Sequence, residues 1–204
     1  MNRAFKVAFA AFMLAAGFAG SVAAGPFEAA VAAHEKGVAA DEKGVYATAL
    51  RLLRPLAEQG EASAQYNLGL MFDNGQGVQQ NYATAVSWYR RAAEQGHADA
   101  QNNLGVMYAQ GRGVPQDHAT AASWYQKAAE QDHAMAQYNL GVMYANGWGV
   151  PQDDVRALMW INLSAAQGNQ DAVKFRNLVA EVMTPAQITE AQKLAREWKP
   201  KSER

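Results

Sequence analysis

A unit of 36 residues occurs three times in the middle of this chain. Glycine recurs at one position of the unit and tryptophan at another: Gly69, Gly105 and Gly141, and Trp88, Trp124 and Trp160. A period of this length is typical of a solenoid, in which each unit buries its apolar face only against its neighbours. The spacing therefore predicts a stack of similar units, an architecture that offers a broad surface to other molecules.

Each unit contains the patterns of two helices. In the first helix, apolar residues recur at intervals of three and four, as on one helix face: Ala64, Leu68, Met71 and Phe72. Gly75 and Gly77 are expected to end this helix, because glycine reaches left-handed backbone conformations at little cost. The second helix is expected from about Tyr82 to Gln95, with its tryptophan packed in the interior.

Glycine also lies in the interior of each first helix, where it costs about 1 kcal/mol relative to alanine. Because this cost is repeated at Gly69 and its two equivalents, we expect another helix to cross very closely there. One turn departs from the repeat, since Asp132 stands where the other units have glycine. The backbone geometry of that turn stays open.

The second unit carries the fullest set of recurring residues. They are Asn103-Leu104-Gly105, Met107-Tyr108, Gly111, Gly113-Val114-Pro115-Gln116-Asp117, Ala121, Trp124-Tyr125 and Ala128-Ala129. This pattern resembles the Sel-one-like repeat family, whose units are slightly longer relatives of tetratricopeptide repeats. The resemblance implies an all-α fold, a right-handed α-solenoid of stacked antiparallel helix pairs with capping terminal helices. It also implies that the first helices line the concave face.

The first 24 residues have the layout of a secretory signal peptide. Arg3 and Lys6 precede an apolar run, and small residues then lead to an expected cleavage site after Ala24. The run is too short to span a bilayer comfortably, since a spanning helix needs about 20 residues. We therefore expect a periplasmic or secreted protein with no stable membrane insertion after cleavage.

Three further segments are expected along the chain. Residues 25–63 are predicted to form a degenerate N-terminal repeat, residues 64–171 the three 36-residue repeats, and residues 172–204 the C-terminal capping helices. The first capping helix is predicted to place its apolar residues on one side: Phe175, Leu178, Val179 and Val182. Thr184 and Gln187 predict a capping box at the start of the last helix. Solenoids need such atypical ends to cover the stack.

The composition argues against several classes of function. The net charge of −1 becomes about −3 once Arg3 and Lys6 are removed, and nucleic-acid binding needs a basic stripe instead. The chain contains no cysteine, so no disulfide framework is expected. Ser87 and Ser123 lack the elbow of a hydrolase nucleophile, and the glycine loops lack the lysine of a phosphate-binding loop. The sequence predicts no enzyme and no cofactor.

The histidines are interpreted as solvated turn residues, and no metal site is predicted. His97 and His133 lie one period apart, so they occupy matching turns of neighbouring units. Adjacent helices lie about 10 Å apart, whereas zinc bonds to imidazole nitrogen are about 2 Å long. Asp117, Asp153 and Asp154 precede or begin second helices, where an acid favours capping over catalysis.

Partner-binding residues are expected on the first helices, away from the packed positions. The predicted stripe contains tyrosines, aliphatics, amides and one acid at intervals of four and three: Tyr66, Leu70, Asp73 and Asn74; Asn102, Val106, Ala109 and Gln110; and Tyr138, Val142, Ala145 and Asn146. Because tyrosine is favoured in binding patches, Tyr66 and Tyr138 are expected to be exposed. The aliphatic residues fit packing against the next unit equally well.

Trp148 lies in a glycine loop where the other units have Gln76 and Arg112. The sequence leaves open whether its ring contacts a partner or is partly buried. The leading hypothesis is an exported, non-catalytic adaptor that binds a protein or an extended peptide in the bacterial cell envelope. One alternative is a cell-wall glycan binder or glycan-associated enzyme accessory that uses Trp148 and nearby acids. Another is a purely structural spacer.

Overall fold

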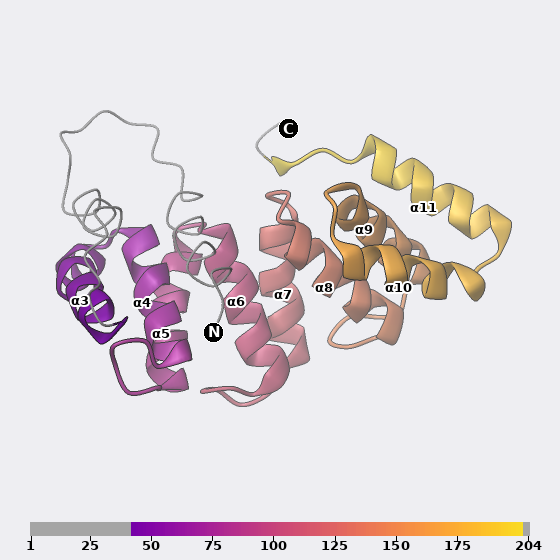
Figure 1. The fold of residues 1–204 in the computed structure, drawn as a ribbon. Helices are drawn as coiled ribbons and strands as arrows, with labels where there is room; N and C mark the ends of the chain where they lie inside the picture. Colours follow the sequence, from indigo (N-terminus) through magenta and orange to yellow (C-terminus); the bar gives the residue numbers. More distant parts are fainter. Residues whose placement is uncertain (1–41, 202–204) are drawn as a thin grey trace.

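The computed structural model describes residues 42–201, which contain nine α-helices and no strand (Figure 1). In chain order these are α3 (Glu42–Glu58), α4 (Ala62–Asn74), α5 (Tyr82–Glu94), α6 (Ala98–Gln110), α7 (His118–Ala129), α8 (Ala134–Asn146), α9 (Asp154–Ala166), α10 (Gln170–Glu181) and α11 (Pro185–Glu197). None of these helices is long and apolar enough to cross a membrane. The expected signal peptide at 1–24 and the first helix of the degenerate repeat lie outside the described residues.

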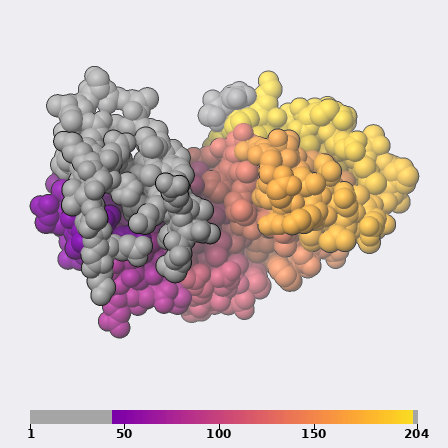
Figure 2. Space-filling view, viewed as in Figure 1, coloured from indigo at the N-terminus to yellow at the C-terminus, as the bar shows by residue number. Residues whose placement is uncertain are grey.

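The helices pack as consecutive pairs along the stack. We call α4, α6, α8 and α10 the A helices, and α3, α5, α7 and α9 the B helices. From α4 to α8, each A helix packs most extensively on the B helix that follows it and also on the one before it. Figure 1 shows the pairs in chain order from α3 to α10, and the colours follow the same order in the space-filling view of Figure 2. The stack predicted from the period is confirmed.

Turn chemistry sets the ends of both helix types. Gly75 ends α4 with a φ of 70° and donates its N–H to the Met71 carbonyl, and the equivalent glycines end α6 and α8 in the same way. Asp117 and Asp153 cap α7 and α9 by accepting backbone N–H groups, so the predicted capping role is confirmed. Asp132 keeps a left-handed φ of 67°, so its turn resembles the glycine turns.

The interior glycines lie where the two helices of a unit cross. A Cβ atom at any of them would lie 2.5 to 2.6 Å from a side chain of the paired B helix: Gly69 faces Tyr89, Gly105 faces Tyr125 and Gly141 faces Ile161. Carbon atoms do not approach so closely, so these positions tolerate no side chain. The predicted close crossing is confirmed, and a bulky residue on the B helix explains why glycine is needed.

The recurring tryptophans differ in their burial. Trp160 is buried, at 6% exposure, and packs in the core as predicted. Trp88 and Trp124 are only half-buried, and a cation lies over each ring, Arg91 at 4.7 Å and Lys127 at 3.9 Å from the ring centroid. Both rings still pack against buried core residues, so their predicted inward position is confirmed, but they are not fully buried as Trp160 is.

The C-terminal helices close the stack in two different ways. Both helices pack on α9. Helix α10 does so in the position of an A helix, and α11 is an additional helix outside the A and B pattern. Thr184 and Gln187 form the predicted capping box at the start of α11. After α11 the chain runs back along the stack, and the Lys201 N–H donates to the Glu130 carbonyl at 2.8 Å.

Candidate functional site

The A helices leave one continuous strip of side chains accessible. In α6, Asp99 and Gln110 are exposed, and Asn103 and Val106 between them are partly exposed. Steps of four, three and four residues keep these positions on one side of the helix. The equivalent positions of the four A helices form what we call the A-helix strip: Ser63, Asn67, Leu70 and Asn74; Asp99, Asn103, Val106 and Gln110; Met135, Asn139, Val142 and Asn146; and Asp171, Phe175, Leu178 and Val182. All except Asn67 are at least partly exposed.

Four of the nine predicted partner-binding residues lie on this strip. They are the aliphatic residues Leu70, Val106 and Val142, which are partly exposed, and the exposed amide Gln110. Four others lie one position before a strip residue and therefore point about 100° away round the helix. These four are Tyr66, Asp73, Asn102 and Tyr138.

Tyr66 is buried, so the expectation that it would be exposed was wrong. Its ring stacks on the His97 imidazole at 4.7 Å and lies 5.9 Å from the Tyr89 ring. Burial raises the pKa of Tyr66 well above its usual range. The ring is wedged between α5 and the start of α6, where its large apolar area stabilises the joint between two units.

Tyr138 is partly buried, and its ring meets the Phe175 ring of α10 edge to face at 6.1 Å. Asn102 is buried and inaccessible to a partner. Its side chain donates to Asn103 at 3.2 Å and accepts from Asn139 at 3.1 Å, which links α6 to α8. Both residues therefore act in packing between units, and the strip itself carries Asn103 and Asn139 in their place.

Asp73 is engaged inside the chain. Its carboxylate forms an ion pair with Arg112 at 2.5 Å and accepts from the Tyr89 hydroxyl at 3.2 Å. The Arg112 guanidinium also lies 4.3 Å from the Tyr82 ring centroid. These contacts tie a loop to the preceding unit, and the Asp73 side chain is only 15% exposed, against 53% for Asp99. Asp73 therefore contributes to the joint and is little accessible to a partner.

Trp148 is half-exposed and stacks on His118, with ring centroids 5.7 Å apart. The equivalent residues of the other two glycine loops also contact the preceding B helix, through different interactions. Gln76 donates to the Tyr46 hydroxyl at 3.0 Å, and Arg112 lies over Tyr82. The two possibilities left open by the sequence are thus combined, since one ring face packs on the preceding unit and part of the ring is accessible.

The sequence reasoning missed a ladder of buried glutamines. Each one lies in the first turn of an A helix. Its side chain donates to a carbonyl at the end of the preceding B helix and accepts from a second glutamine of its own unit. The three sets are Gln65 with Ala57 and Gln95, Gln101 with Ala93 and Gln131, and Gln137 with Ala129 and Gln167. The donor–acceptor distances are 2.7 to 3.4 Å. The same amide at the same place in three units was the signal that could have revealed it.

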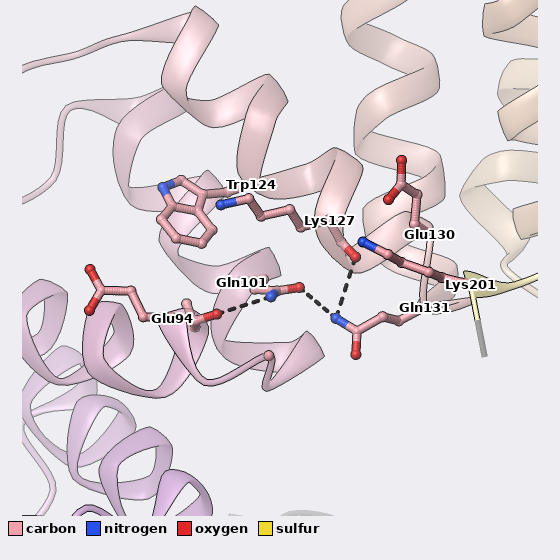
Figure 3. A pocket seen from close by; sticks show the side chains of 9 residues that line it. Glu94, Gln101, Trp124, Lys127, Glu130, Gln131 and Lys201 are labelled. Atoms are coloured by element: carbon pink, nitrogen blue, oxygen red, sulfur yellow. Dashed lines mark hydrogen bonds between the residues drawn. The ribbon is translucent and has the colours of Figure 1, made fainter.

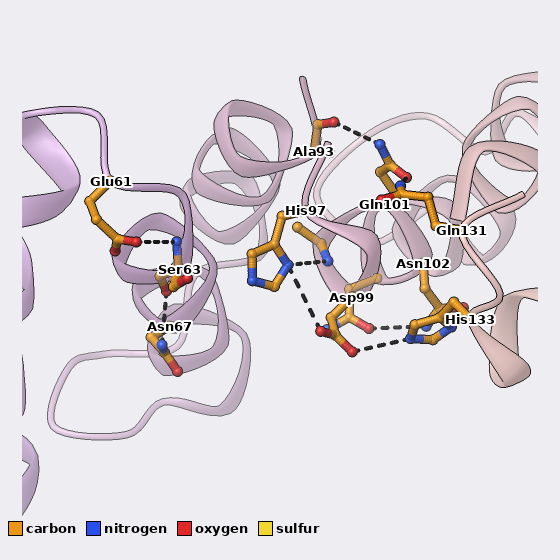
Figure 4. A network of polar contacts seen from close by, with 12 residues as sticks. Glu61, Ser63, Asn67, Ala93, His97, Asp99, Gln101, Asn102, Gln131 and His133 are labelled. Atoms are coloured by element: carbon orange, nitrogen blue, oxygen red, sulfur yellow. Dashed lines mark hydrogen bonds and ion pairs between the residues drawn. The ribbon is translucent and has the colours of Figure 1, made fainter. Parts of the chain in front are cut away.

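His97 and His133 are helix caps, so the interpretation as solvated turn residues was wrong (Figure 4). His133 Nδ1 accepts the Ala136 N–H at 3.1 Å, and its Nε2 lies 3.1 Å from Asp99 Oδ1. The hydrogen bond from His133 lowers the pKa of the Asp99 carboxyl, and burial lowers the pKa of His97. Within residues 42–201, no group of three or more acidic or histidine side chains is placed to hold a metal.

A shallow hollow lies near the ends of α5 and α7 (Figure 3). It is lined by Trp124, Lys127, Glu94, Gln101, Glu130, Gln131 and Lys201, with the backbone of Ala93 and Gly96. Gln101 and Gln131 belong to the glutamine ladder, and the Lys127 ammonium lies over the Trp124 ring. Because these polar groups already have partners in the chain, the hollow is a junction between units.

Comparison with known families identifies the repeat. The family model of the Sel1 repeat matches residues 62–97, 98–133 and 134–169, so each matched unit begins at or next to the start of an A helix. The chain belongs to the Sel1 repeat family. Proteins of this family are generally scaffolds for protein–protein interaction and are typically non-catalytic. No curated protein matches this Sel1 repeat chain.

Several solved structures resemble this chain. A Sel1 repeat protein from Oxalobacter formigenes is 44% identical, with a TM-score of 0.58 over 63% of this chain and 96% of that one. Cysteine rich protein B of Helicobacter pylori is 21% identical, with a TM-score of 0.53 over 68% and 99%. The protective antigen c5321 of uropathogenic Escherichia coli is 33% identical, with a TM-score of 0.46 over 80% and 42%. The predicted right-handed α-solenoid of antiparallel helix pairs is confirmed.

Proposed function

We propose that this chain is an exported, non-catalytic adaptor that binds an extended segment of a partner protein in the bacterial cell envelope. The observation that carries this proposal is the A-helix strip. Four A helices present equivalent positions side by side, and the last three of the four strip positions on α6 and α8 alternate amide, aliphatic and amide: Asn103, Val106 and Gln110, and Asn139, Val142 and Asn146.

The amides of the strip suit the backbone of an extended chain. A side-chain amide both donates and accepts hydrogen bonds, as a peptide group does. Adjacent A helices lie about 10 Å apart, and an extended chain advances about 3.3 Å per residue. Each unit would therefore meet about three residues of the bound segment, while Val106 and Val142 contact its apolar side chains.

The charge of the strip favours a protein segment over a nucleic acid. Helices α4, α6 and α8 contain no lysine and no arginine. Their acids are Asp73, which is paired with Arg112, and Asp99, which contacts His133. Because binding to a phosphate backbone depends on cations, this surface has little affinity for nucleic acid.

Export is supported by the signal-like sequence at 1–24. Fractionation of the producing cells should recover the protein in the periplasm or the medium, with an N-terminus at Gly25. Recovery of the full-length chain in the cytoplasm would contradict this part of the proposal.

Site-specific photocrosslinking tests the binding surface. A photoreactive amino acid replaces the exposed strip residues Gln110 or Asn146, and the matched controls are the exposed B-helix residues Ser87 or Ser123. We expect the strip positions to yield an adduct with an envelope protein in living cells, and the control positions to yield none. Equal adducts at both faces, or none on the strip, would contradict the assignment.

A second candidate function, glycan binding, is favoured by the half-exposed Trp148 ring. An indole with one open face can stack on a sugar, although here its other face already packs on His118. Titration with peptidoglycan fragments separates the two functions. Saturable glycan binding that is lost in Trp148→Ala would favour this candidate, and an absence of binding in both forms would remove it. The spacer hypothesis predicts neither glycan binding nor strip crosslinks.

A further inference from the structure

The exposed apolar side chains of this molecule are concentrated at one end of the strip. Among the described residues, four large hydrophobic side chains are exposed, and three of them belong to the A-helix strip: Met135 at 46%, Leu178 at 59% and Val182 at 75%. Isolated exposed apolar residues are common on protein surfaces, but a group on one face needs an explanation. The strip therefore has a polar end on α4 and α6 and an apolar end on α8 and α10.

The apolar end is a continuous surface across two helices. The Tyr138 ring of α8 contacts the Phe175 ring of α10 at 6.1 Å, and Asn169 at the start of α10 reaches the Met135 sulfur at 4.0 Å. Val142 and Leu178 hold equivalent positions on these adjacent helices. A bulky side chain placed between α8 and α10 would contact both residues.

The helices on either side of α8 each carry an exposed acid in their first turn. Asp99 is one unit before Met135 and is exposed, and Asp171 is one unit after it and is also exposed. The hydrogen bond from His133 favours the ionised form of Asp99. Asp171 lies 3.4 Å from Lys174, an exposed pair that contributes little to neutralising the surface. Helix α8 itself has no charged side chain, and α10 also carries Lys174 and Arg176, whereas α6 has no lysine or arginine, so Asp99 is the acid that is free of a cation on its own helix.

We propose that the apolar end of the A-helix strip binds a partner segment in which a bulky apolar residue, held between α8 and α10, is followed or preceded by a lysine or arginine that pairs with Asp99. This inference rests on the proposed function and specifies its partner. The polar end on α4 and α6 binds the remaining backbone of the same segment through its amides. The order of the apolar residue and the cation in the segment therefore sets the direction in which it lies along the strip.

The spacing of the two recognition elements follows from the geometry. Asp99 and Met135 are equivalent positions on neighbouring A helices, which lie about 10 Å apart. Leu178 lies one helix further along the stack and seven residues further along its own helix, which is about 10 Å at 1.5 Å per residue. The anchor between α8 and α10 therefore lies about 18 to 22 Å from Asp99, and at about 3.3 Å per extended residue the cation and the apolar anchor should lie about five to seven residues apart.

A peptide array tests this specification with the full-length protein purified from the cells that produce it. Each peptide carries one Leu or Phe and one Lys in a Gly-Ser-Asn background, at every separation from one to ten residues. We expect the strongest binding at separations of about five to seven residues, and a loss of at least about tenfold when Lys becomes Glu or the apolar residue becomes Gly. Binding that is independent of both residues would overturn the proposal.

Two variants and a control locate the binding on the protein. Leu178→Glu changes an exposed residue and is expected to weaken the best peptide at least about tenfold. Asp99→Asn is expected to weaken only the Lys-containing peptides and to reduce the salt dependence of their binding. Gln192→Glu adds the same charge to an exposed position of α11 and should change nothing. Unchanged affinity in Leu178→Glu would overturn the proposal.

The remaining outcomes distinguish this inference from the proposed function and from other occupants. If strip crosslinks form in cells but array binding ignores the Leu178 and Asp99 variants, the partner specification fails and the adaptor function stands. If no crosslink and no peptide is found, both fail. Self-association that Leu178→Glu abolishes would assign the apolar end to a second copy of this chain. Binding to vesicles of anionic lipid that the same variant abolishes would assign it to a membrane, and either result would overturn the proposal.

Discussion

Trp124 and Trp160 hold the same position in neighbouring units, and yet their surroundings differ. Trp124 is half-buried, and the Lys127 ammonium lies 3.9 Å from the centroid of its ring. Trp160 is buried, and the Trp198 ring after α11 meets it edge to face at 5.8 Å. The repeat thus fixes where the indole lies, whereas the neighbouring element decides how much water reaches it. A cation protects the middle of the stack and a second indole protects its end.

The sharpest test of this comparison is to truncate each indole. Trp160→Ala should lower the free energy of unfolding by about 3–5 kcal/mol, the cost of removing a large buried side chain. Trp124→Ala should cost about 1–3 kcal/mol, because part of its ring is already in water. Urea denaturation followed by circular dichroism measures both losses. Equal losses would show that the neighbouring element has no influence.

The next largest effect is expected from the covering indole. Trp198→Ala should cost about 1–2 kcal/mol through the lost ring contact and should shift the Trp160 fluorescence to longer wavelength. The indole N–H of Trp198 is buried without a hydrogen-bond partner. Trp198→Phe is therefore a control that should be nearly neutral, because it keeps an aromatic contact and removes the unpaired donor. A large loss in the Phe variant would contradict this explanation.

A smaller effect is expected from the cation in the middle of the stack. Lys127→Ala should lower the free energy of unfolding by about 0.5–1 kcal/mol, the usual value for an exposed cation over a ring. Lys127→Arg should retain the contact and the stability. If Ala and Arg variants unfold at the same urea concentration as the original protein, the lysine contributes nothing to the burial of Trp124.

The smallest expected effect is a pH dependence confined to the middle of the stack. Burial lowers the pKa of His97, which caps α6, although nearby Asp99 and Glu61 act in the opposite direction. Asn169 holds the equivalent cap of α10 and does not titrate. A depressed folded-state pKa means that the stabilisation is present above the unfolded pKa of about 6.5 and is lost as the pH falls below it.

His97→Asn should therefore flatten the dependence of the unfolding free energy on pH between about pH 7 and pH 5. The titration of Asp99 falls below this window, because its pKa is also lowered. Urea denaturation at a series of pH values checks the prediction. An unchanged slope in the variant would place the pH dependence at another group.

The sequence predicted those features that depend on contacts inside the repeat. The 36-residue period gave the stack, and the glycine at position 69 and its equivalents gave the helix crossing. The capping box at Thr184 needed only four consecutive residues to be recognised. Such features follow from local chemistry or from repetition, so a single chain is enough to find them.

The candidate site was predicted only in part, because it depends on the rotation of each helix. One position corresponds to about 100°, so Asn102 was placed on the binding surface although it is buried and its neighbour Asn103 is the accessible residue. For Tyr66 the residue type was ambiguous, because tyrosine fits both a binding patch and a core, and only the position of His97 decides between them. Leu178 and Val182 were expected on a packed side, but no helix within residues 42–201 covers them, and this depends on where α11 packs.

The glutamine ladder has a consequence for how such a chain can change in length. Gln101 is satisfied only when Ala93 of the preceding unit and Gln131 of its own unit stand at fixed offsets. Inserting or deleting a few residues between them would leave a buried amide without a hydrogen-bond partner, at a cost of about 1–3 kcal/mol. Loss or gain of one complete unit preserves every offset. Evolution and engineering can therefore lengthen or shorten this molecule by whole modules far more readily than by single residues.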